Sequence, residues 1–120
     1  PKCVEFLRGE KRRTKPVLQH YVFIRYAKGT SEEHIAGFCR RMLDLRAKIG
    51  EIVQLEIGRD VLREARSWDV LLNMRFQSVE ALRRYQQHPE HLAVMAYNQP
   101  CVAEVGALDF YDPLTSPDKT

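Results

Sequence analysis

The sequence predicts a single α+β domain, on three observations. Its 120 residues are the size of one domain. Segments in which apolar side chains recur at every second position, as in strands, alternate with segments in which they recur at every third or fourth position, as in helices. The composition, 44% hydrophobic and 29% charged, is that of an ordinary globular protein, and no run approaches the roughly 20 apolar residues of a membrane-spanning helix.

A strand and a helix are predicted first. Residues 18–27, LQHYVFIRYA, are rich in β-branched and aromatic side chains, which favour a strand. A helix should begin after Gly29, because Thr30 and Glu33 have the spacing of a capping box, and it should end at Gly50 in a conformation with positive φ. Its buried side is an apolar stripe of Ile35, Phe38, Cys39, Met42, Leu45 and Ile49.

Three further strands and a second helical region complete the domain. Residues 51–58, EIVQLEIG, alternate between apolar and polar side chains, which predicts a strand with one buried face. After a polar connector, residues 68–76 are the third predicted strand. Ser78 should then cap a helix over residues 79–87, and residues 102–111 are the last predicted strand.

This order of elements, β-α-β-β-α-β, is the ferredoxin-like arrangement, an antiparallel four-stranded sheet with the helices on one face. The other face is then uncovered. The first strand is nevertheless apolar on both faces, with Val22 and Ile24 on one and Tyr21 and Phe23 on the other. An exposed apolar sheet face of this size is unusual in a monomer, so we expect a homodimer in which two sheets face each other as a dimeric α/β barrel.

Basic charge is concentrated at the start of the chain. Residues 1–16 contain six basic and two acidic side chains, a net charge of +4, whereas the other 104 residues sum to −1. We therefore divide the chain into a basic N-terminal extension (1–17), the folded domain (18–112) and a polar C-terminal tail (113–120). Nucleic-acid-binding proteins usually carry their basic surface on the folded body, so no nucleic-acid partner is expected.

The cellular setting is expected to be cytoplasmic. Three cysteines, Cys3, Cys39 and Cys101, have no paired spacing, which fits a reducing compartment. The start of the chain has no apolar core of signal-peptide length, and no membrane partner is expected.

Three segments are similar to one known family, the stress-responsive A/B barrel (Dabb) proteins: HYVFIRYAKGTSEE, FQSVEALRRYQQHPEHLAV and GALDFYDP. The resemblance spans residues 18–112, and its most specific element is F-x-S-x-E-A-L-x-x-Y-x-x-H-P-x-H, from Phe76 to His91. His20 and Asp109 also fit the family pattern. The resemblance implies a dimeric barrel of two ferredoxin-like protomers with facing sheets, and it adds no cofactor.

Members of this family differ in role. Some are stress-induced plant proteins without established chemistry, and one is a cofactor-free polyketide cyclase that closes a ring by aldol condensation in a pocket between sheet and helices. The working tyrosine and histidine of that cyclase align with Tyr85 and His91, and its first-strand histidine aligns with His20. The resemblance therefore implies Tyr85, His91 and His20 as catalytic residues. The long extension before the first strand departs from the family pattern and is a candidate cover for a pocket mouth.

The residues around Pro89 indicate how such a site would be built. Pro89 should end the second helix and precede a short helical piece over residues 91–97, which places His91 in a first helical turn. A helix N-terminus disfavours positive charge and so favours neutral imidazole, the form that a general base needs. His20 lies on the inward face of its strand and Tyr85 on the inward stripe of its helix, so we expect the three side chains to meet in one partly apolar cavity.

Structural interpretations stand beside the functional one. Tyr85 could simply bury its ring and hydrogen-bond its hydroxyl within the protein. His91 could only bond a backbone group at the start of a helix, and His20 could be a core histidine whose hydrogen bonds are made within the protein. His88 is interpreted as an exposed residue with a structural role at the helix boundary before Pro89, and His34 as a solvent-exposed surface residue. The histidines match no zinc-ligand spacing, so no metal is expected.

The sequence thus leaves three hypotheses. The first is a cofactor-free cyclase or isomerase that moves a proton on a carbonyl or polyketide-like aromatic ligand, with His91 as base and Tyr85 as acid or oxyanion donor. The second is a non-catalytic dimer that is stress-associated or binds a ligand. The third is a cofactor-free oxygenase, which rests on fold analogy alone. The residues do not separate the first two.

Overall fold

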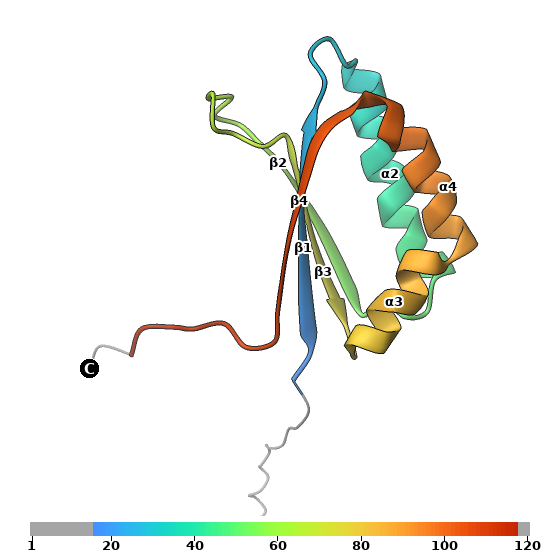
Figure 1. The fold of residues 1–120 in the computed structure, drawn as a ribbon, viewed down its shortest axis with the longest axis vertical. Coiled ribbons are helices and arrows are strands. Elements are labelled where there is room, and N and C mark those ends of the chain that lie inside the picture. Colours follow the sequence, from blue (N-terminus) through green and yellow to red (C-terminus); the bar gives the residue numbers. More distant parts are fainter. Residues whose placement is uncertain (1–15, 118–120) are drawn as a thin grey trace, which may run out of the picture.

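The described part of the chain, residues 16–117 of a computed structural model, confirms the predicted ferredoxin-like α+β fold (Figure 1). The elements are β1 (Leu18–Tyr26), α2 (Glu32–Lys48), β2 (Gln54–Arg59), β3 (Val70–Phe76), α3 (Val79–Gln87), α4 (Pro89–Asn98), the 3-10 turn η1 (Gln99–Cys101) and β4 (Val102–Phe110). Residues 1–15 of the predicted extension and 118–120 of the predicted tail lie outside the described residues. No helix within the described part is long and apolar enough to cross a membrane.

The four strands form one antiparallel sheet in the order β2-β3-β1-β4. Figure 1 shows α2, α3 and α4 on the same side of this sheet. Because side chains alternate across a strand, even-numbered residues of β1 point to the helices and odd-numbered ones point to the other face. The register carries this alternation across the sheet: Val22 lies between Leu72 of β3 and Ala107 of β4.

Both predicted ends of the first helix were wrong in detail. The N-cap of α2 is Ser31, whose Oγ accepts the N–H of His34 at 3.0 Å, whereas Thr30 donates its hydroxyl to a main-chain carbonyl in the preceding turn. At the other end, Gly50 does not take a positive φ. The helix ends because Ile49 adopts an extended conformation and buries its side chain in the core.

Strand and helix boundaries also moved. The second and third strands begin later than predicted, at Gln54 and Val70, and the helical piece predicted over residues 91–97 is the longer α4. Ile52, predicted to lie in a strand, belongs to the turn after α2, where its N–H bonds to the Ile49 carbonyl at 3.3 Å and its side chain is buried. A short apolar run alone does not distinguish a strand from a buried turn.

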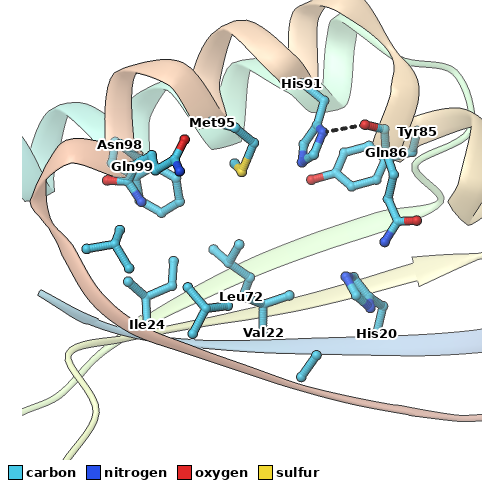
Figure 2. A pocket seen from close by; sticks show the side chains of 14 residues that line it. His20, Val22, Ile24, Leu72, Tyr85, Gln86, His91, Met95, Asn98 and Gln99 are labelled. Carbon is cyan, nitrogen blue, oxygen red and sulfur yellow. Dashed lines mark hydrogen bonds between the residues drawn. The ribbon is translucent and has the colours of Figure 1, made fainter.

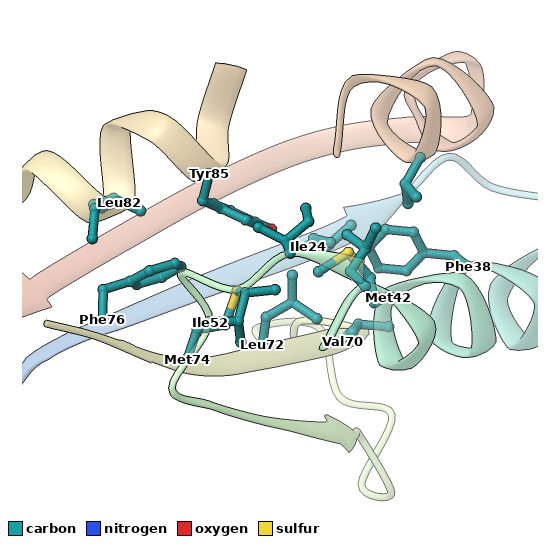
Figure 3. Packing of buried hydrophobic residues seen from close by; sticks show 14 of the residues in the cluster. Ile24, Phe38, Met42, Ile52, Val70, Leu72, Met74, Phe76, Leu82 and Tyr85 are labelled. Carbon is teal, nitrogen blue, oxygen red and sulfur yellow. The ribbon is translucent and has the colours of Figure 1, made fainter. Parts of the chain in front are cut away.

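The core lies between the sheet and the helices (Figure 3). Its largest fully buried side chains come from α2, from β3 and from the turn between α2 and β2: Phe38, Met42, Leu45, Ile49, Ile52, Val70, Met74 and Phe76. Each contributes roughly 1.5–3 kcal/mol when fully buried. Tyr85 of α3 belongs to the same apolar layer, so the polar candidate site begins at the edge of the core.

The sheet face without helices, here called the open face, is apolar along β1 and β4. Its large apolar side chains are Tyr21, Phe23, Trp68, Leu71, Leu108 and Phe110. Tyr21 stacks on Phe110 with 5.4 Å between ring centroids, and the rings of Phe23 and Trp68 are 5.9 Å apart. Leu108 is 56% exposed. Within the described residues, an apolar surface therefore stays uncovered on this face.

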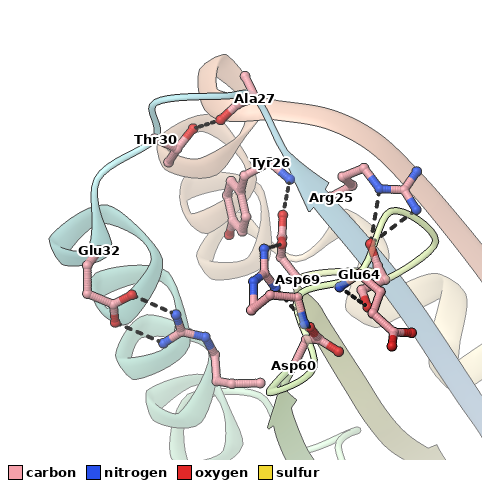
Figure 4. Close-up of polar contacts among 11 residues, drawn as sticks. Arg25, Tyr26, Ala27, Thr30, Glu32, Asp60, Glu64 and Asp69 are labelled. Carbon is pink, nitrogen blue, oxygen red and sulfur yellow. Dashed lines mark hydrogen bonds and ion pairs between the residues drawn. The ribbon is translucent and has the colours of Figure 1, made fainter.

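A polar network fixes the end of β1 at which Tyr26 lies (Figure 4). The main-chain N–H of Tyr26 donates to Asp69 at 2.7 Å, and Arg63 pairs with the other carboxylate oxygen of Asp69. Nearby, Arg59 makes two hydrogen bonds to Glu32, at 2.9 and 3.1 Å, which tie β2 to the start of α2. These contacts hold Tyr26 in place, and its hydroxyl group reaches the candidate site.

Candidate active site

A cavity of about 330 Å³ lies between the helices and the β1–β4 side of the sheet (Figure 2). Its walls are mostly apolar and come from β1, β3, β4, α2 and α4. Polar side chains stand at its two ends: His20, Tyr85, Gln86 and His91 at one, and Asn98 and Gln99 at the other. An apolar pocket with a few convergent polar groups is the usual form of a small-molecule site.

The backbone of the preceding helix fixes the orientation of His91. His88 ends α3 and begins α4, and its Nδ1 accepts the N–H of Glu90 at 3.1 Å, so the chain turns sharply before Pro89. His91 Nδ1 then lies 3.0 Å from the carbonyl oxygen of Gln86. Because a carbonyl oxygen only accepts, Nδ1 carries the proton, and Nε2 of the neutral ring is an acceptor available to a ligand.

The surroundings of His91 favour this neutral ring. Burial lowers the pKa of His91 below its usual value of 6.5. The hydrogen bond to Gln86 acts in the opposite direction, and the neighbouring His20 and His88 lower the pKa further. The imidazole is therefore unprotonated at neutral pH and able to accept a proton.

Tyr85 lies directly against His91. Their ring centroids are 4.4 Å apart, and on another side the phenol ring packs on Phe76 at 5.1 Å. Tyr85 is only 2% exposed, yet Figure 2 shows its hydroxyl pointing into the cavity, where it has no hydrogen-bond partner among the described residues. Burial raises the pKa of Tyr85 well above its usual value, so the phenol stays protonated and can donate a hydrogen bond to a ligand.

His20 reaches the cavity from the sheet and is paired with Asp109. The β1–β4 register places the two residues opposite each other, and His20 Nδ1 bonds to the Asp109 carboxylate. A carboxylate in this position holds the proton on Nδ1 and leaves Nε2 as the acceptor, as in the His–Asp pairs of hydrolases. His20 also meets Phe76 edge-on, with 6.1 Å between ring centroids, so its ring plane is fixed by packing as well.

A second polar cluster stands at the opposite end of the cavity. Asn98 Oδ1 accepts the Tyr26 hydroxyl at 2.6 Å and His34 Nε2 at 3.1 Å. The prediction that His34 is solvated surface was wrong, because its ring is half-buried and stacks on Tyr97 with 4.5 Å between centroids. A sequence signal was present: His34 lies four residues before Phe38, in line with the apolar stripe of α2.

The structure brings the three predicted site residues to one end of one cavity: His20, Tyr85 and His91. His88 caps two helices and does not line the cavity. Asp109 and Asn98 were not predicted as site residues. Pairing the first and last strands in antiparallel register would have placed Asp109 beside His20, whereas no local pattern singles out Asn98. Among residues 16–117, no group of three or more His, Cys, Asp or Glu side chains is placed to hold a metal ion.

The family model described as Stress responsive A/B Barrel Domain matches residues 18–112. The chain belongs to the Dabb family. This match covers the segment in which the sequence resemblance was found, and it includes every candidate site residue. None of the curated proteins compared with this Dabb chain matches it.

Solved structures share the Dabb fold. A dimeric ferredoxin-like protein of unknown function from Thermobifida fusca is 22% identical, with a TM-score of 0.73 over 85% of this chain and 96% of that chain. The hydroxynitrile lyase from Passiflora edulis is 19% identical, with a TM-score of 0.75 over 87% of this chain and 100% of that chain. A Dabb family protein from Mesorhizobium loti is 21% identical, with a TM-score of 0.67 over 83% and 99%. At these identities the likeness shows the fold alone.

Proposed function

We propose that this Dabb protein catalyses proton transfer on a small carbonyl compound without a cofactor, in the ring closure or isomerisation of an aromatic or polyketide-like molecule. One observation carries the proposal. His91 Nε2 is left unprotonated by the hydrogen bond from Nδ1 to Gln86, and it stands in one apolar cavity with a Tyr85 hydroxyl that has no partner among the described residues. A base beside a hydrogen-bond donor is what enolisation requires.

The two groups have complementary tasks. His91 Nε2 removes a proton from the carbon next to the carbonyl, the C–H electrons form a carbon–carbon double bond, and the carbonyl oxygen becomes an enolate. The Tyr85 hydroxyl donates a hydrogen bond to that oxygen and stabilises the developing charge. Protonated His91 then returns the proton to the product. Since the carbonyl accepts the electrons, this step draws on no cofactor, and the His20–Asp109 pair stands at the same end as a second proton carrier.

Two likenesses support an enzyme in this fold. Tyr85, His91 and His20 match the working residue types of the family's polyketide cyclase, and a hydroxynitrile lyase has the same fold. A non-catalytic dimer that only binds a ligand would use the same cavity. A proton-exchange assay is therefore needed to distinguish such a binding protein from an enzyme. The oxygenase hypothesis has no supporting observation in the described residues.

We also propose that the chain forms a homodimer through the open face. That face carries an apolar surface formed by the aromatic side chains of β1 and β4 and by Trp68. A second copy would cover these side chains. Several proteins of the same fold are described as dimeric.

Tyr85→Phe is the first test of the catalytic proposal. We expect the protein to accelerate the exchange of the acetyl protons of 4-ethylacetophenone for deuterium in deuterated water, which NMR can follow. This assay can be run without knowing the natural substrate. Removing the hydroxyl that stabilises the enolate should slow this exchange by about 10²–10³-fold. Stability should change by less than about 0.5 kcal/mol, because no hydrogen bond within the described residues is lost.

The structural interpretation of Tyr85 predicts the reverse. If the hydroxyl only satisfies a buried contact, Tyr85→Phe costs about 1 kcal/mol of unfolding free energy and leaves exchange unchanged. Thermal or urea unfolding, run beside the exchange assay, separates the two outcomes.

The lowered pKa of His91 gives a pH prediction with a definite sign. Exchange should be constant at neutral pH and fall on the acid side with a midpoint below the usual value of 6.5, because only the neutral ring accepts a proton. The folded protein binds this proton less readily than the unfolded chain. The stability that depends on neutral His91 is therefore complete above about pH 6.5 and is lost as pH falls through the folded-state pKa. Unfolding curves at a series of pH values should show this loss, and His91→Asn should remove that part of it.

A further inference from the structure

The cavity has a second polar end that the proposed proton transfer does not use. Asn98, the last residue of α4, is 3% exposed. His91, Met95 and Asn98 are spaced at i, i+4 and i+7, so they project from one face of α4, and all three line the cavity. Seven residues of helix span about 10 Å, which is the separation of the two polar ends along α4.

The orientation of the Asn98 side chain is fixed. Its Oδ1 accepts the Tyr26 hydroxyl at 2.6 Å and His34 Nε2 at 3.1 Å. Both donors are themselves held, Tyr26 by the hydrogen bond from its N–H to Asp69 and His34 by its stack on Tyr97. A carboxamide whose oxygen is occupied by two donors presents its nitrogen elsewhere, and Figure 2 shows the amide of Asn98 at the cavity wall.

The nitrogen of this amide therefore supplies unused donors. Within residues 16–117, Asn98 Nδ2 has no hydrogen-bond partner, and Ile24 and Met95 are among the apolar side chains that line the same cavity. Although Asn98 as a whole is 3% exposed, Nδ2 is not among the fully buried atoms without a partner, so an acceptor atom on a bound ligand can reach it and form a hydrogen bond. Gln99 also stands at this end, but it is exposed, so its amide can turn to solvent.

The walls also restrict the charge of the acceptor. None of the described side chains that line the cavity is Lys, Arg, Asp or Glu. Burying a carboxylate or phosphate here would leave an anion without a cation, which is strongly unfavourable. An uncharged oxygen, such as that of a ketone, ester or amide, carries no such cost.

We propose that Asn98 determines specificity by donating its amide N–H groups to an uncharged carbonyl oxygen at the end of the ligand remote from His91 and Tyr85. The substrate class is then an elongated dicarbonyl compound with an apolar middle, whose two oxygens are on the order of 10 Å apart or less. The identity of the reacting end rests on the proposed function, whereas the role of Asn98 rests on its own contacts.

Two small ketones of similar shape test this inference. 1,4-Diacetylbenzene has a carbonyl at both ends, and 4-ethylacetophenone has an ethyl group in place of one of them. In NMR titrations of the full chain, we expect the diketone to bind about five- to tenfold more tightly, the effect of one buried hydrogen bond. Asn98→Asp keeps the acceptor for Tyr26 and His34 but replaces the donor by a second acceptor, so it should abolish or invert the preference. Gln87→Glu makes the same chemical change at an exposed residue of α3 that does not line the cavity, and it should preserve the preference.

Equal affinities of the wild-type chain for the two ketones, or a preference that survives Asn98→Asp, would overturn the role of Asn98. Should Asn98→Asp not fold, Tyr26→Phe takes its place: it removes one of the two contacts that orient the amide, and an unchanged preference then overturns the inference. The exchange assay separates this result from the catalytic proposal. If the protein accelerates exchange but binds the two ketones equally, the proton-transfer proposal stands and the role of Asn98 is wrong. If it prefers the diketone but does not accelerate exchange, Asn98 is a binding residue and the catalytic proposal is wrong.

Discussion

His91→Asn should slow acetyl-proton exchange by about 10²–10⁴-fold, the range expected when a general base is removed. Asparagine can still present an N–H to the Gln86 carbonyl in place of His91 Nδ1, so the contact that fixes the start of α4 is kept. What is lost is Nε2, the nitrogen that faces the ligand. The measurement is the exchange rate of 4-ethylacetophenone at neutral pH, with unfolding followed in parallel.

His88→Asn is the matched control for this experiment. His88 is a neighbouring histidine that caps α4 and does not line the cavity, and asparagine is itself a favourable N-cap. It should therefore leave exchange unchanged. Equal losses in both variants would mean that the start of α4 matters only structurally, and an unchanged rate in His91→Asn would remove the histidine from the mechanism.

The alternation of apolar side chains along the strands was sufficient to predict which residues lie on which face of the sheet, because successive side chains of a strand point to opposite faces. Val22 and Ile24 were assigned to the helix side and Tyr21 and Phe23 to the other, and the register confirms both assignments. One error, at the start of α2, lies where two neighbouring residues have the same chemistry. Thr30 and Ser31 both carry a cap-forming hydroxyl, and only the path of the turn after β1 decides which of them caps α2.

The candidate site was predictable where a local motif or the family resemblance names a residue, as it does for His20, Tyr85 and His91. His91 lies within one short motif with Tyr85, and the family resemblance names both residues. Asn98 gains its role from Tyr26 and His34, which are 72 and 64 residues away in the chain. Such contacts depend on how α2, α4 and β1 pack together, and no local spacing reports that.

Phe23→Asp should separate the proposed dimer. Phe23 lies in the centre of the open face, on β1 opposite Leu71 of β3 and against Trp68. The guanidinium of Arg25, which lies over Trp68, is already paired with Glu104, so a carboxylate buried at this position would cost about 3–5 kcal/mol. A twofold interface contains the substitution twice. Association should weaken at least about a thousandfold. Light scattering at micromolar concentration should then give the mass of one chain, and circular dichroism shows whether that chain is still folded.

Val61→Asp is the control, because it adds the same charge at an apolar residue that is 85% exposed in the connector between β2 and β3. It should leave the mass of the assembly unchanged. Leu71→Asp places the charge on the neighbouring strand of the open face and should act like Phe23→Asp. If the wild-type chain is a monomer at micromolar concentration, or if the Phe23 variant stays dimeric, the open face is not the interface. Its aromatic side chains would then need another cover, because a surface of this kind is rarely left in contact with water.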